Sequence, residues 1–433
     1  MPSSTATDSP QTLLLGVRDR LRIMPDVRSH AHALDLCASI SARPRLLARA
    51  LVLLCLGATV RGASALRVAF IADTGIGNDK PGSVWTDHWG NRREPSYKVD
   101  GIECKTYEGK YCGSYSRARD VIALAEDASV DLIVHAGDLD YVSSPMSWFH
   151  FLTETVWRRG GRFVAVKGNH DVDGWDGVQD LWSNPERGYQ ALLSKQIPRG
   201  AKYYGSYGED FAMETGGVLF VMSSVGCERP GESANREKYD FIDRALSASK
   251  ARWKVCVWHM TMESLQVSYK GDATGFGAYE ICRKHGAFIV TGHAHVYSRS
   301  YTMARFGTKV YGFTRSDLRV HDWNQNVITL RAGEDGTTGL AVVGIGGYKN
   351  EAMLTDSGVW AKVYSTSCLA GSKTCERASD ARKFGALVCD FGTSSEAKCE
   401  LRVVARPGAS PDARRAAATN ADEARDVFAL RRA

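Results

Sequence analysis

The stretch Leu132-Ile-Val-His-Ala-Gly-Asp-Leu-Asp-Tyr141 joins a short apolar run to a glycine and two carboxylates. The apolar part has the length of a buried strand, and the Gly137-Asp138 pair after it is typical of a tight turn. The same order of apolar run, polar or glycine-bearing loop and helical stretch recurs along the chain. The other runs lie at 66–72, 163–166, 218–223, 254–259 and 288–291, with helical spacing at 115–128 and 236–250. This alternation predicts an α/β fold with mostly buried strands.

The second half of the chain adds short extended segments with glycine-rich turns between them. These segments lie at 309–313, 326–331, 340–345, 387–391 and 399–404. Such a pattern is typical of mixed or antiparallel strands. We therefore expect the second half to extend the same α/β domain and not to form a separate one.

Side chains that can bind metal ions follow five of the apolar runs. They are Asp73, Asp138, Asn169 with His170 and Asp171, His259, and His293 with His295. Each alone has an ordinary explanation, such as a helix cap, a tight turn or a core histidine. The carboxyl ends of strands in an α/β sheet are where ligands bind, so residues distant in sequence can meet there. Together they predict one site for two metal ions about 3.5–4 Å apart, of the iron, manganese or zinc type.

These motifs, in this order, resemble those of calcineurin-like metallophosphoesterases and specifically of purple acid phosphatases. The motifs are Asp73-x-Gly75, Gly137-Asp138-x-x-Tyr141, Gly168-Asn169-His170-Asp171, a strand that ends at His259, and Gly292-His293-x-His295. Many other members of the superfamily have a metal-binding histidine where this chain has Gly75. In purple acid phosphatases a tyrosine three residues after the bridging aspartate binds iron instead, and Tyr141 occupies that position. The resemblance implies a four-layer α/β/β/α sandwich with two mixed sheets, in a single catalytic domain at 66–404.

The resemblance also implies a binuclear centre of iron(III) and a divalent ion, which would be iron, zinc or manganese. The iron(III) ligands would be Asp73, Asp138, Tyr141 and His295, and Asp138 would bridge to a divalent site of Asn169, His259 and His293. A trivalent ion lowers the pKa of a bound water, so the nucleophile would be a metal-bound hydroxide. His170 would hold the phosphate or protonate the leaving oxygen, and Asp171 would orient it. The implied reaction is hydrolysis of phosphate monoesters at acidic to neutral pH, as in acid phosphatases.

Two parts of the chain depart from the family pattern. Family members usually carry a further histidine about ten residues beyond the strand histidine, whereas this chain has Ser268-Tyr269-Lys270 there. A polar, aromatic segment at 81–114 is typical of an insertion at the mouth of a site. The alternative function is therefore a metal-dependent phosphodiesterase acting on nucleotides or lipid headgroups. A non-catalytic metal- or phosphate-binding protein is a third hypothesis. His135 is interpreted as a strand residue that supports the site.

The first 65 residues have the features of a leader. The apolar segment at 46–60 follows three arginines and precedes a small-residue pattern at 63–65, which predicts a secretory signal. A start at Met24, an organelle-targeting leader and a signal anchor are the alternatives. We expect a secreted protein, or one in the lumen of the secretory pathway, with no stable membrane span once the leader is removed. The oligomeric state is left open.

Charge is concentrated in the two terminal segments. Eight arginines against four aspartates in 1–65, and six arginines against four acids in 405–433, account for the whole formal charge of +6. The 66–404 domain is thus near neutral, so net charge does not indicate an obligatory nucleic-acid partner, and we expect a small phosphoester substrate. Residues 405–433, rich in alanine, arginine, aspartate and proline, predict a disordered or loosely helical tail.

Nine of the 11 cysteines lie beyond the leader. Their spacing favours local disulfides between Cys104 and Cys112, between Cys368 and Cys375, and between Cys389 and Cys399, in an oxidising compartment. Cys227, Cys256 and Cys282 are then left over. Cys256 lies in an apolar, strand-like run and is interpreted as a buried free thiol.

Overall fold

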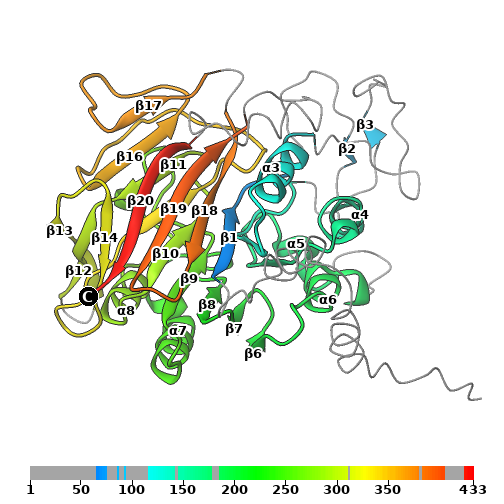
Figure 1. The fold of residues 1–433 in the computed structure, drawn as a ribbon, viewed down its shortest axis with the longest axis horizontal. Helices are drawn as coiled ribbons and strands as arrows, with labels where there is room; N and C mark the ends of the chain where they lie inside the picture. The colour runs from blue at the N-terminus through cyan, green and yellow to red at the C-terminus, as the bar shows by residue number, and fades with distance from the viewer. Residues whose placement is uncertain are drawn as a thin grey trace, which may run out of the picture. The chain divides into compact units, whose positions relative to one another are not determined.

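The described part of the chain lies within one compact unit, Ala63–Ala433, of this computed structural model (Figure 1). The described residues are 65–75, 85–86, 92–93, 116–141, 145–177, 185–310, 313–379, 383–404 and 424–433. The apolar segment at 46–60, the expected Cys104–Cys112 pair and nearly all of the 81–114 segment lie outside these residues. No helix among the described residues is long and apolar enough to cross a membrane.

One sheet has seven strands in the order β14-β20-β19-β18-β1-β4-β5. Their bounds are β14 Val327–Leu330, β20 Ala424–Arg432, β19 Glu396–Val403, β18 Gly385–Phe391, β1 Leu66–Ile71, β4 Leu132–His135 and β5 Phe163–Ala165. β1, β4 and β5 are parallel neighbours, whereas β18, β19 and β20 pair in antiparallel fashion. β1 and β4 read as continuous apolar runs because both faces of the sheet are covered.

The other large sheet has nine strands in the order β17-β16-β11-β15-β10-β9-β8-β7-β6. Their bounds are β17 Cys375–Arg377, β16 Trp360–Ser365, β11 Tyr297–Ser300, β15 Leu340–Val343, β10 Phe288–Thr291, β9 Trp253–Trp258, β8 Val218–Ser223, β7 Asp210–Thr215 and β6 Lys202–Ser206. β8, β9, β10 and β15 form a parallel block at its centre. This sheet is therefore also mixed, as expected.

Two-stranded pairs and short helices complete the described secondary structure. The expected strand at 309–313 instead spans the end of β12 (Thr302–Val310) and the start of β13 (Phe313–Asp322), which pair with each other. The remaining short elements are β2 Trp85–Thr86, β3 Arg92–Arg93, α5 Val172–Trp175, α6 Tyr189–Ser194, η2 Trp157–Arg159, η3 Pro185–Arg187, η4 Ser233–Asn235 and η5 Glu263–Leu265.

The two sheets pack face to face, and helices cover their outer faces (Figure 1). Phe70 of β1 meets Phe220 of β8 between the sheets, with ring centroids 6.4 Å apart. α3 (Ser116–Asp127) and α4 (Pro145–Glu154) cover the seven-stranded sheet, and α7 (Arg236–Ala248) and α8 (Gly277–Lys284) cover the nine-stranded one. The buried residues of α7 recur at helical spacing, which gives the helix one apolar face for the sheet. The expected four-layer α/β/β/α arrangement is confirmed.

The prediction of a disordered or helical tail is wrong for Ala424–Arg432. This segment forms β20, which lies between β14 and β19 inside the seven-stranded sheet. Its side chains alternate, with Asp426, Phe428 and Leu430 buried. Two buried apolar side chains are enough to hold this strand in the sheet, because both neighbouring strands supply hydrogen bonds. The arginine-rich composition obscured the alternation of buried and exposed side chains in the sequence.

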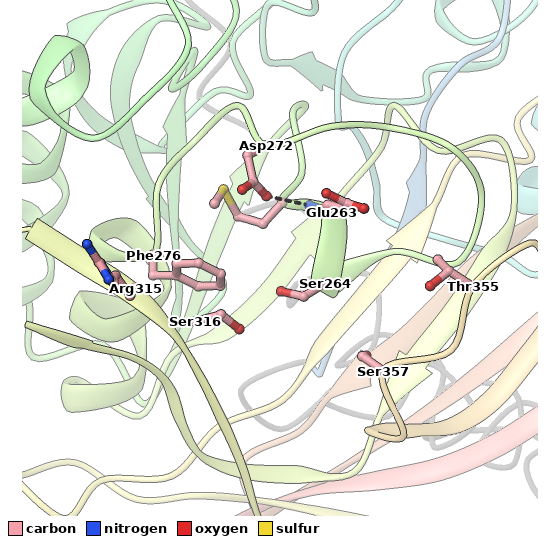
Figure 2. A pocket seen from close by; sticks show the side chains of 9 residues that line it. Glu263, Ser264, Asp272, Phe276, Arg315, Ser316, Thr355 and Ser357 are labelled. Atoms are coloured by element: carbon pink, nitrogen blue, oxygen red, sulfur yellow. Dashed lines mark hydrogen bonds between the residues drawn. The ribbon is translucent and has the colours of Figure 1, made fainter.

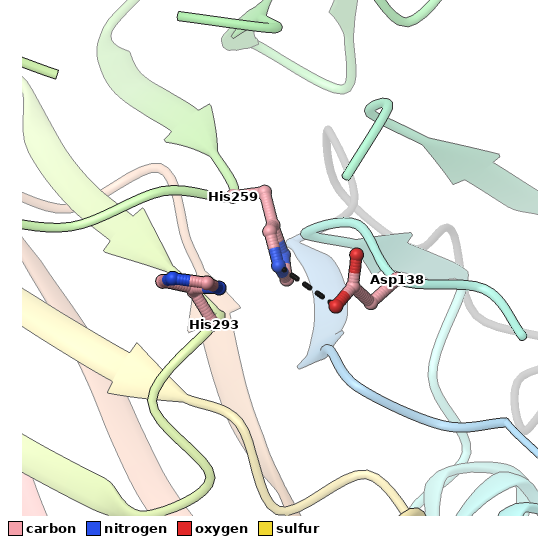
Figure 3. A group of neighbouring side chains, drawn as sticks. All are labelled: Asp138, His259 and His293. Carbon is pink, nitrogen blue, oxygen red and sulfur yellow. Dashed lines mark ion pairs between the residues drawn. The ribbon is translucent and has the colours of Figure 1, made fainter. Parts of the chain in front are cut away.

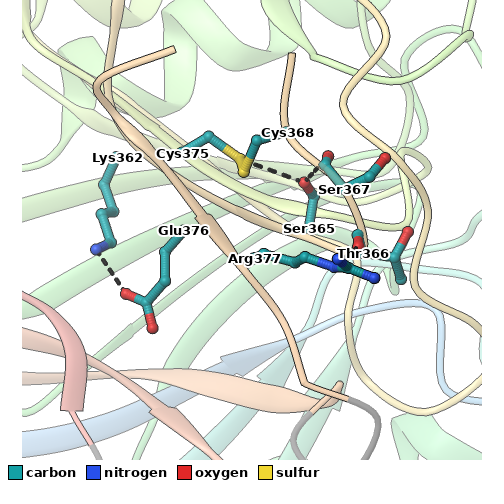
Figure 4. Close-up of a disulfide and its surroundings, with 8 residues drawn as sticks. All are labelled: Lys362, Ser365, Thr366, Ser367, Cys368, Cys375, Glu376 and Arg377. Atoms are coloured by element: carbon teal, nitrogen blue, oxygen red, sulfur yellow. Dashed lines mark hydrogen bonds and ion pairs between the residues drawn. A yellow bond between two sulfur atoms is a disulfide. The ribbon is translucent and has the colours of Figure 1, made fainter. Parts of the chain in front are cut away.

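Three disulfides are present among the described residues. Cys368–Cys375 and Cys389–Cys399 confirm the spacing argument, the first beside Ser365 and the Lys362–Glu376 ion pair (Figure 4). The interpretation of Cys256 as a free thiol is wrong, because Cys256 of β9 is bonded to Cys282 of α8. The two cysteines are far apart in sequence and meet only because α8 packs on the sheet, so spacing could not reveal the pair. Cys227 is a free thiol.

Candidate metal centre

The carboxyl ends of five strands bring the predicted ligands together. Asp73 follows β1, Asp138 follows β4, Asn169 follows β5, His259 follows β9, and His293 and His295 follow β10. β1, β4 and β5 run parallel in one sheet, and β9 and β10 run parallel in the other. The loops after these strands therefore converge at one end of the sandwich, which is where an α/β architecture is expected to bind ligands.

Asp73, Tyr141 and His295 form one tight group. Tyr141 Oη donates a hydrogen bond to Asp73 Oδ1 over 2.9 Å. His295 Nε2 lies 2.9 Å from Tyr141 Oη and 3.2 Å from Asp73 Oδ1. The other oxygen of Asp73 accepts the backbone N–H of His293 over 3.0 Å, which ties the loop after β1 to the loop after β10.

Asp138, His259 and His293 form a second group (Figure 3). One ligand atom from each lies within 4.8 Å of the others. His259 is fully buried, and its Nδ1 lies 2.8 Å from the Ala136 carbonyl oxygen, which requires the proton on Nδ1. His259 Nε2 then faces Asp138 Oδ2 over 3.1 Å, where a metal ion would replace the proton that joins them. Fixing a histidine tautomer through its second nitrogen is characteristic of metal ligands.

Gly75 and Tyr141 are spatially complementary. A Cβ at position 75 would lie 2.4 Å from Tyr141 Cδ2, and Gly75 has a φ of +51°. The phenol ring therefore fills the space that a side chain at position 75 would need. Tyr348 stacks on the ring of Tyr141, with ring centroids 3.5 Å apart and an interplanar angle of 10°.

Backbone strain is concentrated at the centre. Four non-glycine residues of the described chain have positive φ: Asp73 at 57°, Ser129 at 56°, Asp138 at 55° and His293 at 66°. Three of the four are predicted ligands. Such conformations cost about 1–3 kcal/mol each and persist where the surrounding structure requires them, most often at functional sites.

The donor set fits a pair of metal ions. Asp138 Oδ2 and His259 Nε2 are buried and contact each other over 3.1 Å, and Asn169 Oδ1 is buried without a hydrogen-bond partner among the described residues. Buried polar atoms are almost always paired, so an unpaired amide oxygen in a loop next to the two groups of predicted ligands is consistent with a cation site. These three atoms offer carboxylate, imidazole and amide donors, and Asp73, Tyr141 and His295 add a carboxylate, a phenol and an imidazole. This mixture of oxygen and nitrogen donors suits iron, zinc or manganese.

Electrostatics in the ligand cluster favour a bound cation. Burial opposes charge on Asp138 and on Asp73, yet the nearby histidines hold the pKa of both carboxyls below the usual value. Burial is likewise outweighed at His259, where Asp138 and Asp73 raise the pKa to about 9. Burial and the charge of His259 lower the pKa of His293 to about 3. The carboxylates thus attract positive charge to the position of His259, and a metal ion supplies more of it than a proton.

His170 and Asp171 lie beside the cluster, but not in the relation expected from sequence. His170 is exposed, its backbone N–H donates to Asp138 Oδ1 over 2.9 Å, and its ring lies 4.4 Å from the ring of Tyr141. Asp171 is buried and accepts the N–H groups of Asp138, Leu139 and Gly168 at 2.8–2.9 Å. The expectation that Asp171 orients the His170 imidazole is therefore corrected: its carboxylate fixes the backbone of two ligand loops.

Two further residues support the ligands and were not foreseen. Glu351 Oε1 lies 3.2 Å from His295 Nδ1, and Tyr348 packs on Tyr141. The only sequence signal for them is the glycine-rich segment at 344–347 just before them. His135 was interpreted as a supporting strand residue, and its Nε2 lies 2.9 Å from Thr74 Oγ1, next to Asp73.

A pocket of about 480 Å³ lies along the loop that follows β9 (Figure 2). Met262 and Phe276 form its apolar part, and Glu263, Asp272 and Arg315 provide its charges. Asp272 Oδ1 accepts the backbone N–H of Glu263 over 2.8 Å. None of the metal-ligand residues lines this pocket.

The family described as calcineurin-like phosphoesterase matches residues 66–297, more than half of the chain. The match begins with β1 and ends at the first residue of β11, so it contains all the predicted ligands. No curated protein matches this sequence.

Two solved structures match this chain at low sequence identity. Purple acid phosphatase PPD1 from yellow lupin (Lupinus luteus) seeds has a TM-score of 0.47 and 17% sequence identity, over 85% of this chain and 54% of the lupin protein. PhoD has a TM-score of 0.39 and 12% identity, over 80% of this chain and 68% of PhoD. This chain therefore spans about half the length of the lupin protein.

Proposed function

The chain belongs to the calcineurin-like phosphoesterase family, and on that premise we propose that it hydrolyses phosphate monoesters as an enzyme of the purple acid phosphatase type. Membership of the family makes it a phosphoric ester hydrolase and implies a binuclear metal centre. The observation that carries the finer assignment is the fit of Tyr141 against Gly75, where a side chain cannot enter. A phenol in place of a missing ligand is the arrangement that selects iron(III) for one of the two sites.

The two groups of contacts support a division of the ligands between two metal ions. Asp73, Tyr141 and His295 would hold iron(III), since their donor atoms lie within 3.2 Å of one another. His259, His293 and Asn169 would hold a divalent ion of iron, zinc or manganese. Asp138, which faces His259 at 3.1 Å, would bridge the two. When bound, the metal pair supplies Lewis acidity and an activated water for attack on phosphorus.

The protein side chains then have separate tasks. Burial and the charges of Asp73 and Asp138 raise the pKa of Tyr141 well above its usual value, so Tyr141 stays a phenol unless a cation offsets them. Exposed His170, on the open side of Tyr141, would bind a phosphate oxygen or give a proton to the leaving alcohol. Asp171 would keep the two ligand loops in register through its three backbone hydrogen bonds.

Optical spectroscopy tests the iron assignment. An iron(III)–phenolate pair should give a visible charge-transfer band, and the band should disappear in Tyr141→Phe while Tyr348→Phe retains it. Metal analysis of the same samples should give two ions per chain, at least one of them iron in the wild type. A colourless, fully metallated and active wild-type enzyme would refute the assignment.

The choice between monoester and diester is tested with two substrates that release the same alcohol, p-nitrophenol. We expect p-nitrophenyl phosphate to be hydrolysed faster than bis(p-nitrophenyl) phosphate at pH 5–7. A clear preference for the diester would instead support the alternative phosphodiesterase, with nucleotides or lipid headgroups as substrates. Metal-loaded protein with no turnover of any phosphoester would support a binding protein.

We also propose that the protein works in an oxidising compartment, as a secreted protein or in the lumen of the secretory pathway. The three disulfides support this, because such bonds are rare in reducing compartments. Thiol counting of protein from its native source, under denaturing conditions, should find Cys256, Cys282, Cys368, Cys375, Cys389 and Cys399 oxidised. Reduced thiols at these positions would contradict the assignment.

A further inference from the structure

Two lysines contact Tyr269 in the loop that follows His259. Lys270 Nζ lies 4.6 Å from the centroid of the Tyr269 ring, and Lys349 Nζ lies 5.7 Å from it. Lys349 Nζ also donates a hydrogen bond to Tyr269 Oη over 3.3 Å. Tyr269 itself is 58% exposed. An exposed aromatic ring with two ammonium groups on it is a cationic feature open to solvent.

A short chain of contacts connects this feature to the metal centre. His295 Nδ1 lies 3.2 Å from Glu351 Oε1, and Glu351 Oε1 lies 2.9 Å from Lys349 Nζ. Lys349 then reaches Tyr269. Tyr269 is thus separated from the ligand His295 by two side chains, which places it at the rim of the centre.

The two lysines differ in their partners. Lys349 forms an ion pair with buried Glu351. No carboxylate lies within ion-pair distance of Lys270 in the described structure, where its ammonium rests on the Tyr269 ring. Lys270 is also half-buried, and its ammonium group lies on a ring that the contacts of Lys349 and Glu351 connect to His295. A lysine of a solvated loop would have none of these restraints.

We propose that Lys270 and Tyr269, with Lys349 positioning the ring, form a subsite for a second anionic group, so that the enzyme prefers phosphate esters that carry another phosphate. This rests on the proposed function. The metal ions and His170 meet the charge of the phosphate that is hydrolysed, which leaves Lys270 for a different anion.

The test compares fructose 6-phosphate with fructose 1,6-bisphosphate as substrates, by phosphate release. The wild-type kcat/KM should favour the bisphosphate by more than the factor of two that its second reactive phosphate gives. Lys270→Met should raise KM for the bisphosphate about 5-fold to 10-fold, as expected for loss of one charge-assisted contact, with a smaller change for the monophosphate. Lys270→Arg should retain the preference, and 0.5 M salt should reduce it.

Lys250→Met is the matched control. Lys250 precedes β9, at the opposite end of that strand from His259, so neither ester should respond to it. An unchanged preference in Lys270→Met, or no preference in the wild type, overturns the subsite. If neither ester is hydrolysed, the proposed function fails. The subsite is then tested by calorimetric titration of both esters into metal-loaded protein. Lys270→Met must then weaken binding of the bisphosphate more than binding of the monophosphate.

Discussion

The metal-ligand cluster and the Arg299–Asp426 pair are both buried groups of charge, but they are built differently. Arg299 of β11 donates to both oxygens of Asp426 of β20, from Nε at 2.6 Å and from Nη2 at 2.9 Å, and Tyr297 Oη donates to the same carboxylate at 2.7 Å. Both residues lie in regular strands. In the ligand cluster, by contrast, Asn169 Oδ1 is buried without a hydrogen-bond partner among the described residues, and Asp138 has a positive φ.

The difference separates a site for a ligand from a structural contact. A buried charge whose hydrogen bonds are made within the protein needs no further ligand, so the Arg299–Asp426 pair is a structural contact that is costly to break from one side. Unpaired atoms on a strained backbone are retained only where something else completes them. The two regions are also neighbours in sequence, since β11, which carries Tyr297 and Arg299, begins two residues after His295.

Removal of a bridging ligand should give the largest effect, on rate and not on stability. Asp138→Asn is expected to lower kcat on p-nitrophenyl phosphate by at least about 10³-fold, or about 4 kcal/mol, because the carboxylate no longer joins two metal ions. The metal content of the purified variant should fall as well. Asparagine keeps the shape of the side chain and tolerates positive φ, so thermal unfolding of the metal-free variant should lie within a few degrees of the wild type. Activity within tenfold of wild type would show that Asp138 is not a ligand.

Breaking the Arg299–Asp426 pair should have the next largest effect, on stability. Asp426→Ala leaves the Arg299 guanidinium buried without its carboxylate and should lower the free energy of unfolding by about 3–5 kcal/mol. Denaturant titration of metal-free protein measures this. The double variant Arg299→Met/Asp426→Leu should recover most of the loss. A cost below about 1 kcal/mol for Asp426→Ala would mean that the pair is solvated and not buried.

His135 should make stability depend on pH. Burial lowers the pKa of His135 to about 3, whereas an unfolded histidine titrates near 6.5. Between these values the unfolded chain binds a proton that the folded chain does not, so stability falls as the pH falls. From pH 6.5 to pH 5 the loss should be about 2 kcal/mol. In metal-free His135→Gln this part of the pH dependence should vanish. An unchanged slope of the free energy of unfolding against pH would show that other titrating groups cause it.

The smallest effect should come from an exposed ion pair between β20, the strand of Asp426, and its neighbour β19. Arg431 Nη2 and Glu396 Oε2 lie 3.0 Å apart, with side chains 54% and 50% exposed. Water screens such a pair, so Glu396→Gln should change the free energy of unfolding by less than about 1 kcal/mol. A loss comparable to that of Asp426→Ala would show that strand pairing of β20, and not burial of the charge, determines both results.

The grouping of the predicted ligands could be anticipated from the sequence because most of them lie in short motifs directly after a strand. Asp73, Asp138, His259 and His293 needed only the order of apolar runs and the geometry of parallel strands. The four-layer fold followed from the same alternation together with the resemblance to the family.

Residues whose partners are distant in sequence could not be predicted in this way. Glu351 supports His295, and Cys282 meets Cys256, only after strands and helices have packed. The role of Asp171 was mistaken because sequence places it next to His170, whereas the fold turns its carboxylate toward the backbone of another loop. β20 was missed because its arginines and alanines gave the composition of a tail.

The inner place of β20 in its sheet has a consequence for biosynthesis. All the ligand motifs and both neighbouring strands, β14 and β19, leave the ribosome before residues 424–432 do. Until then the sheet has an empty place between two strands with unpaired N–H and C=O groups, and Arg299 has no counter-ion. A premature stop codon between positions 404 and 424 would therefore yield a chain with every predicted ligand and an unfinished sheet, which is a substrate for chaperones and proteases and not a shorter enzyme.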